Sequence, residues 1–137
     1  MKQTKSSLQI LWGVAFIAFA LHNFEELWCG LPYWSARQSS STWMAAIMPP
    51  QRFVVSIAIL TVLIMLIAVV SIWLSEKSSI IILRIFAWTM MLNATSHVII
   101  SGLTQSLMPG VVTAVCILFP VMALIILQIR HRQSGNL

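Results

Sequence analysis

Four long apolar runs set the main constraint on how this chain can fold. Each is about 20 residues long, which is the length that an α-helix needs to cross the hydrocarbon core of a bilayer. Because backbone amides cannot be left unpaired in hydrocarbon, the runs should form one all-α, four-helix transmembrane bundle, a single domain over residues 1–137. The expected membrane-spanning helices are residues 8–28, 52–75, 80–101 and 110–129.

The composition lies far outside the range of soluble globular domains. Hydrophobic residues make up 59% of the chain and charged residues only 8%. The net charge of +5 comes from Lys and Arg residues that are scattered near segment ends, so we expect membrane lipids as partners and no nucleic acid. Nothing in the sequence specifies an oligomeric state.

Basic residues predict how the bundle is oriented in the membrane. Six of the eight lie near span ends on one side, whereas only Arg37 and Arg52 lie on the other. The positive-inside rule therefore places both termini in the cytoplasm and the loop at residues 29–51 outside, in a multi-pass membrane protein. A short helix through residues 43–48 is expected in this loop. The six residues on the inner side are Lys2, Lys5, Lys77, Arg84, Arg130 and Arg132.

The first span also has features of a cleaved signal peptide. Basic residues precede a short apolar core, and Ala18-Phe19-Ala20 offers a small-x-small cleavage site. Cleavage would leave the polar residues that follow at a new chain terminus, and three further spans already indicate a polytopic protein. We therefore favour an uncleaved first span.

The most unusual polar stretch is His22-Asn23-Phe24-Glu25-Glu26, near the outer end of the first span. It contains two of the only three acidic residues in the chain. In a helix, His22, Glu25 and Glu26 fall at i, i+3 and i+4 and share one face. A charged side chain at mid-span costs about 2.5 to 3.5 kcal/mol, so these carboxylates need a compensating partner.

Other polar groups are expected at the same depth. His22 and His97 lie about six and five residues before the outer ends of the first and third spans, so both lie roughly 8 Å below the same surface. Asn93 is one turn deeper on the face of His97. In the fourth span, Pro120 cannot donate to the carbonyl of Cys116, which lies roughly 9 Å below that surface.

Three kinds of partner can compensate the two glutamates. The first is a divalent cation, Zn²⁺ or Fe²⁺, held by two imidazoles and one or both carboxylates, from His22, His97, Glu25 and Glu26. The second is a salt bridge from Arg52, at the outer start of the second span. The third is protonation, because burial favours a neutral carboxylic acid. We expect one metal ion, most simply zinc, surrounded by Asn23, Asn93, Arg52 and Cys116.

The stretch from His22 to Glu26, followed by Pro32-Tyr33-Trp34, resembles the small bacterial membrane proteins named for their HXXEE motif. The pair Asn93 and His97 in a later span, and Pro109-Gly110 at the start of the last one, are similar to that family too. The resemblance covers most of the chain. It implies an integral membrane domain of uncharacterised function, and it supports the choice of these residues without naming a substrate.

Three functional hypotheses follow from these residues. The leading one is a metal-dependent membrane hydrolase that cleaves an ester or amide in an amphiphile from the outer leaflet, with Glu25 or Glu26 as the base that activates a metal-bound water. The second is a metal-free proton relay or small-solute carrier. The third is a structural or partner-binding membrane subunit. In the simplest structural alternative, the carboxylates reach headgroup water from an interfacial helix end.

Overall fold

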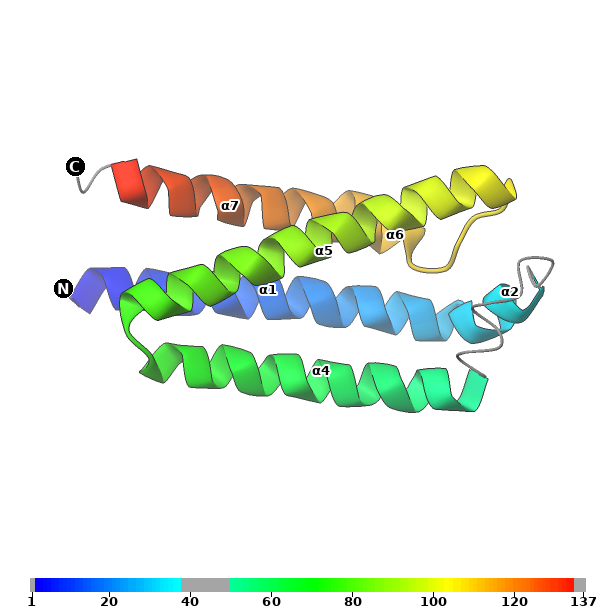
Figure 1. The fold of residues 1–137 in the computed structure, drawn as a ribbon, viewed down its shortest axis with the longest axis horizontal. Helices are drawn as coiled ribbons and strands as arrows, with labels where there is room; N and C mark the ends of the chain where they lie inside the picture. Colours follow the sequence, from blue (N-terminus) through cyan, green and yellow to red (C-terminus); the bar gives the residue numbers. More distant parts are fainter. Residues whose placement is uncertain (1, 38–49, 135–137) are drawn as a thin grey trace.

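Four long helices lie side by side along the length of the molecule (Figure 1). The computed structural model describes residues 2–37 and 50–134, and no strand occurs among them. The long helices are α1 (Lys2–Trp28), α4 (Pro50–Trp73), α5 (Glu76–Thr104) and a C-terminal helix made of α6 (Val111–Thr113), the π-helical turn η2 (Ala114–Leu118) and α7 (Phe119–Ser134).

All four long helices have the length and apolar character needed to cross a membrane. Their outward faces are apolar as well, and α4 is the most exposed of the four. Helices that are hydrophobic all round belong in a bilayer or a large core, and this bundle is too small to provide such a core. The prediction of an all-helical fold with four helices long and apolar enough to span a membrane is therefore confirmed.

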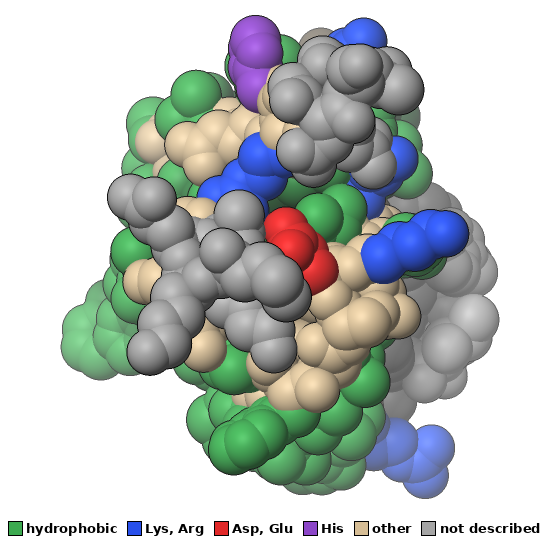
Figure 2. Space-filling model, turned by 90° about the vertical axis from the view of Figure 1, so that its left-hand side faces the viewer, with side chains coloured by type: hydrophobic (Ala, Val, Ile, Leu, Met, Phe, Trp, Pro, Cys, Tyr) green, Lys and Arg blue, Asp and Glu red, His purple; other side chains and the backbone are tan. Residues whose placement is uncertain are grey.

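Both termini lie at one end of the bundle, as an even number of spans requires (Figure 1). Figure 2 shows this end, where basic side chains lie around the rim. Those in the described residues come from the first turns of α5 and the last turns of α7: Lys77, Arg84, Arg130 and Arg132.

The α4–α5 turn is shorter than the sequence indicated. Residues 76–79 are predicted to form a polar turn, but α5 already begins at Glu76. The Ser75 hydroxyl accepts a hydrogen bond from the Ser78 N–H at 3.2 Å and so caps the helix. Glu76 lies in the first turn, where a carboxylate interacts favourably with the helix dipole.

The C-terminal helix begins later than predicted and is locally widened. Gly110 has φ +92°, so helical geometry starts at Val111, and Pro109 precedes the helix. Before Pro120, the Phe119 N–H donates to the carbonyl of Ala114, five residues back. This π-turn accommodates a proline inside the helix, because a wider turn relieves the clash of its ring with the preceding carbonyls.

A short helix, α2 (Leu31–Arg37), forms in the segment that was expected to be a connection. It lies at the end of the bundle opposite the termini (Figure 1). Trp34 Nε1 donates to Ser106 Oγ at 2.8 Å, and Leu31 and Trp34 pack with Met108. The helix expected at residues 43–48 lies outside the described residues.

One stripe along α1 is buried from Leu8 to Glu26. Its positions alternate in steps of three and four residues, the spacing of a helix that packs against neighbouring helices. Each of these side chains is at most 7% exposed. In the half nearer the termini the stripe is apolar, but at the other end it becomes polar. The positions are Leu8, Trp12, Ala15, Phe19, His22 and Glu26.

Candidate metal centre

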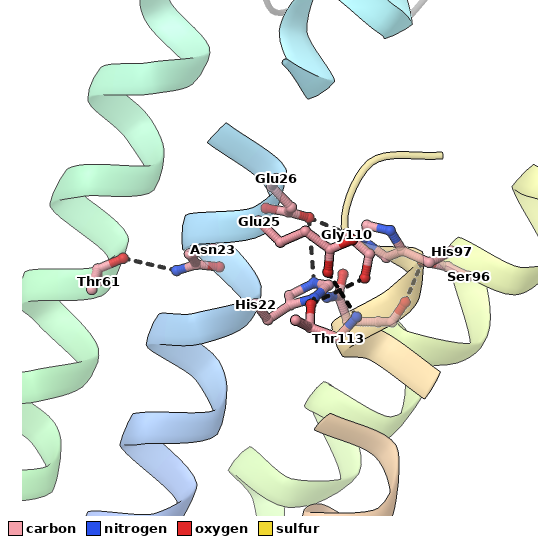
Figure 3. Close-up of polar contacts among 10 residues, drawn as sticks. His22, Asn23, Glu25, Glu26, Thr61, Ser96, His97, Gly110 and Thr113 are labelled. Carbon is pink, nitrogen blue, oxygen red and sulfur yellow. Dashed lines mark hydrogen bonds and ion pairs between the residues drawn. The ribbon is translucent and has the colours of Figure 1, made fainter. Parts of the chain in front are cut away.

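Three side chains that could hold a metal ion meet where the buried stripe of α1 becomes polar (Figure 3). His22 and Glu26 are one helical turn apart on α1, and His97 faces them from α5. Glu26 Oε1 lies 3.0 Å from His97 Nε2 and 3.4 Å from His22 Nε2. One ligand atom from each of the three residues lies within 4.8 Å of the others, and all three residues are buried.

The two imidazole rings are held in a fixed relation to each other. They meet edge to face, with centroids 4.7 Å apart and an interplanar angle of 77°. His22 is fully buried and His97 is 2% exposed. His97 Nδ1 is buried and makes no hydrogen bond with the described residues. The buried imidazoles therefore both present Nε2 to the same carboxylate oxygen.

Two hydrogen-bonding groups flank the ring nitrogens of His22. Thr113 Oγ1 lies 3.1 Å from Nδ1, and Asn93 Nδ2 lies 3.0 Å from Nε2. In the tautomer with the proton on Nδ1, the Thr113 hydroxyl accepts from Nδ1–H and Nε2 carries one lone pair, which either the Asn93 amide or a metal ion can take. In the other tautomer, Nε2–H faces Glu26 Oε1 at 3.4 Å.

The backbone of Gly110 covers this cluster. A Cβ atom added there would lie 2.8 Å from both Glu26 Cγ and His97 Cε1, and 3.1 Å from His22 Cε1. The positive φ of Gly110 independently favours glycine. Glycine thus lets the start of the C-terminal helix pack directly on the three side chains.

Glu25 points to a different partner. Its Oε2 accepts the Thr113 N–H at 2.7 Å, in the first turn of the C-terminal helix. A carboxylate at this position satisfies a free amide and interacts favourably with the helix dipole. Glu25 is partly exposed and does not belong to the group of three possible ligands. The structure therefore brings Glu26, and not Glu25, to the two histidines.

The four residues expected around the site have different positions. Asn93 contacts His22 directly, whereas Asn23 donates to Thr61 Oγ1 of α4 at 2.8 Å and points away from the histidines (Figure 3). Arg52 and Cys116 are exposed. Within residues 6–37 and 52–132, no ion pair joins Arg52 to either glutamate of the motif. The salt bridge from Arg52, one of the three alternatives for compensating the glutamates, is therefore not formed.

Two residues at the centre were not recognised as part of it from the sequence. Gly110 was noted only as part of a helix start, and Thr113 was not noted at all. The signal for Gly110 is a glycine next to a proline at the depth of the two histidines. Thr113 has no comparable signal, because a threonine near a helix N-terminus is common without any role in a site.

A family comparison matches residues 13–125 with the family described as "Protein of unknown function with HXXEE motif". The chain belongs to this family. Searches of curated proteins and of solved structures gave no significant match. In this member, the HXXEE motif has two structural parts. Its His and its second Glu lie on the buried stripe and meet His97, while its first Glu binds the start of the C-terminal helix.

Proposed function

We propose that this protein is a membrane enzyme that uses one divalent metal ion, Zn²⁺ or alternatively Fe²⁺, bound by His22, Glu26 and His97. The observation that supports this most strongly is the convergence of two imidazoles and one carboxylate, all buried, with ligand atoms within 4.8 Å of one another. Two His and one carboxylate form a common ligand set of catalytic zinc, and leave a position open for water. A cation also compensates a carboxylate that is buried at membrane depth.

The proposed reaction is hydrolysis of an ester or amide bond in an amphiphile. A metal lowers the pKa of bound water toward about 7, so the water can attack at neutral pH. The water oxygen bonds to the carbonyl carbon, and its proton passes to Glu25, the carboxylate outside the group of ligands. The bond from that carbon to the leaving oxygen or nitrogen then breaks, and the leaving atom takes the proton.

The proposed location is the bacterial cytoplasmic membrane, with both termini inside and the metal centre in the outer half. The basic side chains at the end with the termini support this orientation (Figure 2). It is tested with Tyr33→Cys, at an exposed position of α2, in a chain without the native cysteines. A membrane-impermeant thiol reagent should label it in intact cells, and labelling only after cell lysis would refute the orientation.

A metal-free proton relay is the second candidate function. The observation that favours it is that Glu26 Oε1 lies within 3.4 Å of Nε2 of both histidines. A carboxylate in this position can pass a proton between two imidazoles without a metal. A purely structural subunit has no such specific support.

Elemental analysis of protein purified in detergent after metal-replete expression tests the main proposal. We expect about one zinc per chain, since three protein ligands plus water complete a tetrahedral site. His97→Ala should lose the metal, whereas His131→Ala should keep it, because His131 is exposed in the last turn of α7. Metal-free wild-type protein, or equal metal content in both variants, would refute the metal centre and favour the proton relay.

A further inference from the structure

A cavity of about 240 Å³ lies beside the metal centre, between α1, α4 and α5. Glu26 and Asn93 line it, so it borders directly on a proposed ligand and on a hydrogen-bond partner of His22. In Figure 1, α4 and α5 diverge from their shared turn toward the end that carries the centre. The cavity occupies part of the space between these two diverging helices and α1.

The lining changes in character along the membrane normal. On α1, Phe19 is seven residues before Glu26, about 10 Å deeper at 1.5 Å per residue. On α5 likewise, Met90 lies deeper than Asn93, and on α4 the polar Ser56 lies between Phe53 at the outer end and Leu60 on the deeper side. The cavity therefore has a polar end at the metal centre and an apolar end toward the middle of the membrane.

Side chains and backbone cover the metal centre at the end of the bundle opposite the termini. The cluster of Leu31, Trp34 and Met108 packs there, and the Gly110 backbone lies against the ligands. Of the three ligands, only Glu26 lines the cavity. A molecule that reaches Glu26 through this cavity therefore comes from between α4 and α5, which is the bilayer side.

The size and charge of the cavity limit what it can hold. Its volume is below the roughly 300 to 1,000 Å³ of sites for drug-sized ligands, which suits one hydrocarbon chain and not two. None of the described residues that line it is Lys or Arg, so the proposed metal ion would be the one cationic partner of a phosphate headgroup, and a phosphate bound there would take the place of the water that the reaction needs. Asn23, Asn93 and Ser56 supply amide and hydroxyl groups that hydrogen-bond an uncharged head.

We propose that this cavity binds the single hydrocarbon chain of an uncharged, ester- or amide-linked amphiphile that enters between α4 and α5. The chain lies along Leu60, Met90 and Phe19, and the carbonyl group reaches the metal centre at Glu26. This inference rests on the proposed function, because it identifies the class of substrate for that centre.

The test is photo-crosslinking with a monoacylglycerol that carries a diazirine in its acyl chain, using full-length protein in nanodiscs. Label should map to the residues of α4 and α5 that line the cavity, and unlabelled monoacylglycerol should compete. Leu60→Trp should lower specific labelling roughly tenfold, because the indole fills the cavity. Ile59→Trp is the matched control, since Ile59 and Leu60 are similarly exposed, at 55% and 46%, and only Leu60 lines the cavity.

The result that overturns the inference is label spread over outward-facing residues, or equal loss of labelling in Leu60→Trp and Ile59→Trp. Equal competition by an anionic lysophospholipid would refute the uncharged headgroup. Metal content, measured on the same preparations, separates the two proposals. Bound metal without specific labelling refutes only the cavity inference, whereas specific labelling of metal-free protein supports the cavity and refutes the metal centre.

Discussion

The buried stripe of α1 contains apolar side chains in the half of the bundle nearer the termini and ionisable side chains in the other half. In the half nearer the termini, Trp12 packs against Phe86 with ring centroids 6.1 Å apart, and its N–H donates to Ser79 Oγ at 3.0 Å. Donor and acceptor are matched in this contact and both groups are neutral, although the nearby Ser71 hydroxyl is buried without a partner among the described residues. In the other half, Glu26 Oε1 lies within 3.4 Å of Nε2 of both histidines, so the buried groups there are ionisable. The first contact is complete without any added group, whereas the second can hold a proton or a metal ion.

This difference predicts that the two halves respond to different perturbations. Substitutions in the apolar half should change stability and leave metal affinity unchanged in the folded protein. Substitutions in the polar half should change metal affinity more than stability. Gly110 should be the exception. Its backbone packs against the proposed ligands, so a substitution there should change both stability and metal affinity.

The largest effect on stability is expected from Trp12→Ala. Trp12 is 2% exposed, and its removal leaves a large cavity and an unpaired Ser79 hydroxyl, at a cost of about 3 to 5 kcal/mol. Unfolding in detergent, followed by circular dichroism, measures this cost. Trp73→Ala is the control, because Trp73 is 85% exposed. Loss of metal from Trp12→Ala protein that is still folded would contradict the separation of the two halves.

Gly110→Ala should lower both stability and metal content. A non-glycine residue at φ +92° costs about 1 to 3 kcal/mol, and the new Cβ also displaces Glu26 and His97. Gly102→Ala is the matched control, since a Cβ there meets nothing within 4 Å. The two variants are compared by unfolding and by zinc analysis. If Gly110→Ala binds metal like wild type, the Gly110 backbone does not hold the ligands in place.

Exchange of each glutamate for glutamine should separate the two carboxylates of the motif. Glu26→Gln should lower metal affinity by at least about 100-fold, or roughly 2.7 kcal/mol, because an uncharged amide replaces a carboxylate ligand. Glu25→Gln should leave metal affinity unchanged, because Glu25 accepts from Thr113 and is not among the three grouped ligands. Competition with a zinc-binding dye measures both. Equal losses would mean that Glu25 is a ligand too.

The smallest of these effects is expected from Thr113→Val. Residues that orient a ligand through its other ring nitrogen typically change metal affinity by about 10 to 100-fold when they are removed, and Thr113 Oγ1 lies 3.1 Å from His22 Nδ1. Asn23→Ala is the comparison, because its amide donates to Thr61 on α4 and not to a histidine. The same dye competition should show a loss for Thr113→Val only. A larger loss for Asn23→Ala would mean that the contact between α1 and α4 holds the site in place.

Sequence reasoning located the spans well but was less accurate at their ends. The apolar runs are long enough that their number and type follow from composition alone. Their ends depend on local hydrogen bonds and backbone angles, such as the cap by Ser75 and the positive φ of Gly110. Similarly, α2 forms where polar residues and a proline indicated a connection, because Trp34 finds its partners, Ser106 and Met108, on distant segments.

For the candidate site, the sequence placed His22, Glu26 and His97 at one depth, but it left Glu25 and Glu26 equivalent. The steps of three and four along α1 distinguish them, since Glu26 continues the positions of Trp12 and Phe19 and Glu25 does not. This spacing identifies Glu26 as the buried carboxylate once the buried face of the helix is known. Arg52 was an equally reasonable partner by depth, and only its exposed position in the bundle sets it apart.

The sequence alone determined that this chain is a four-span membrane bundle with a polar group at one level, because hydrocarbon thickness and the cost of buried charge act on each helix separately. Only the tertiary structure decided which side chains meet. The rotation and spacing of the helices bring His97 to Glu26 and place the Gly110 backbone over both. They also bring Glu25 to the Thr113 N–H and not to a histidine. Those angles arise from packing among all the helices together, and no single span encodes them.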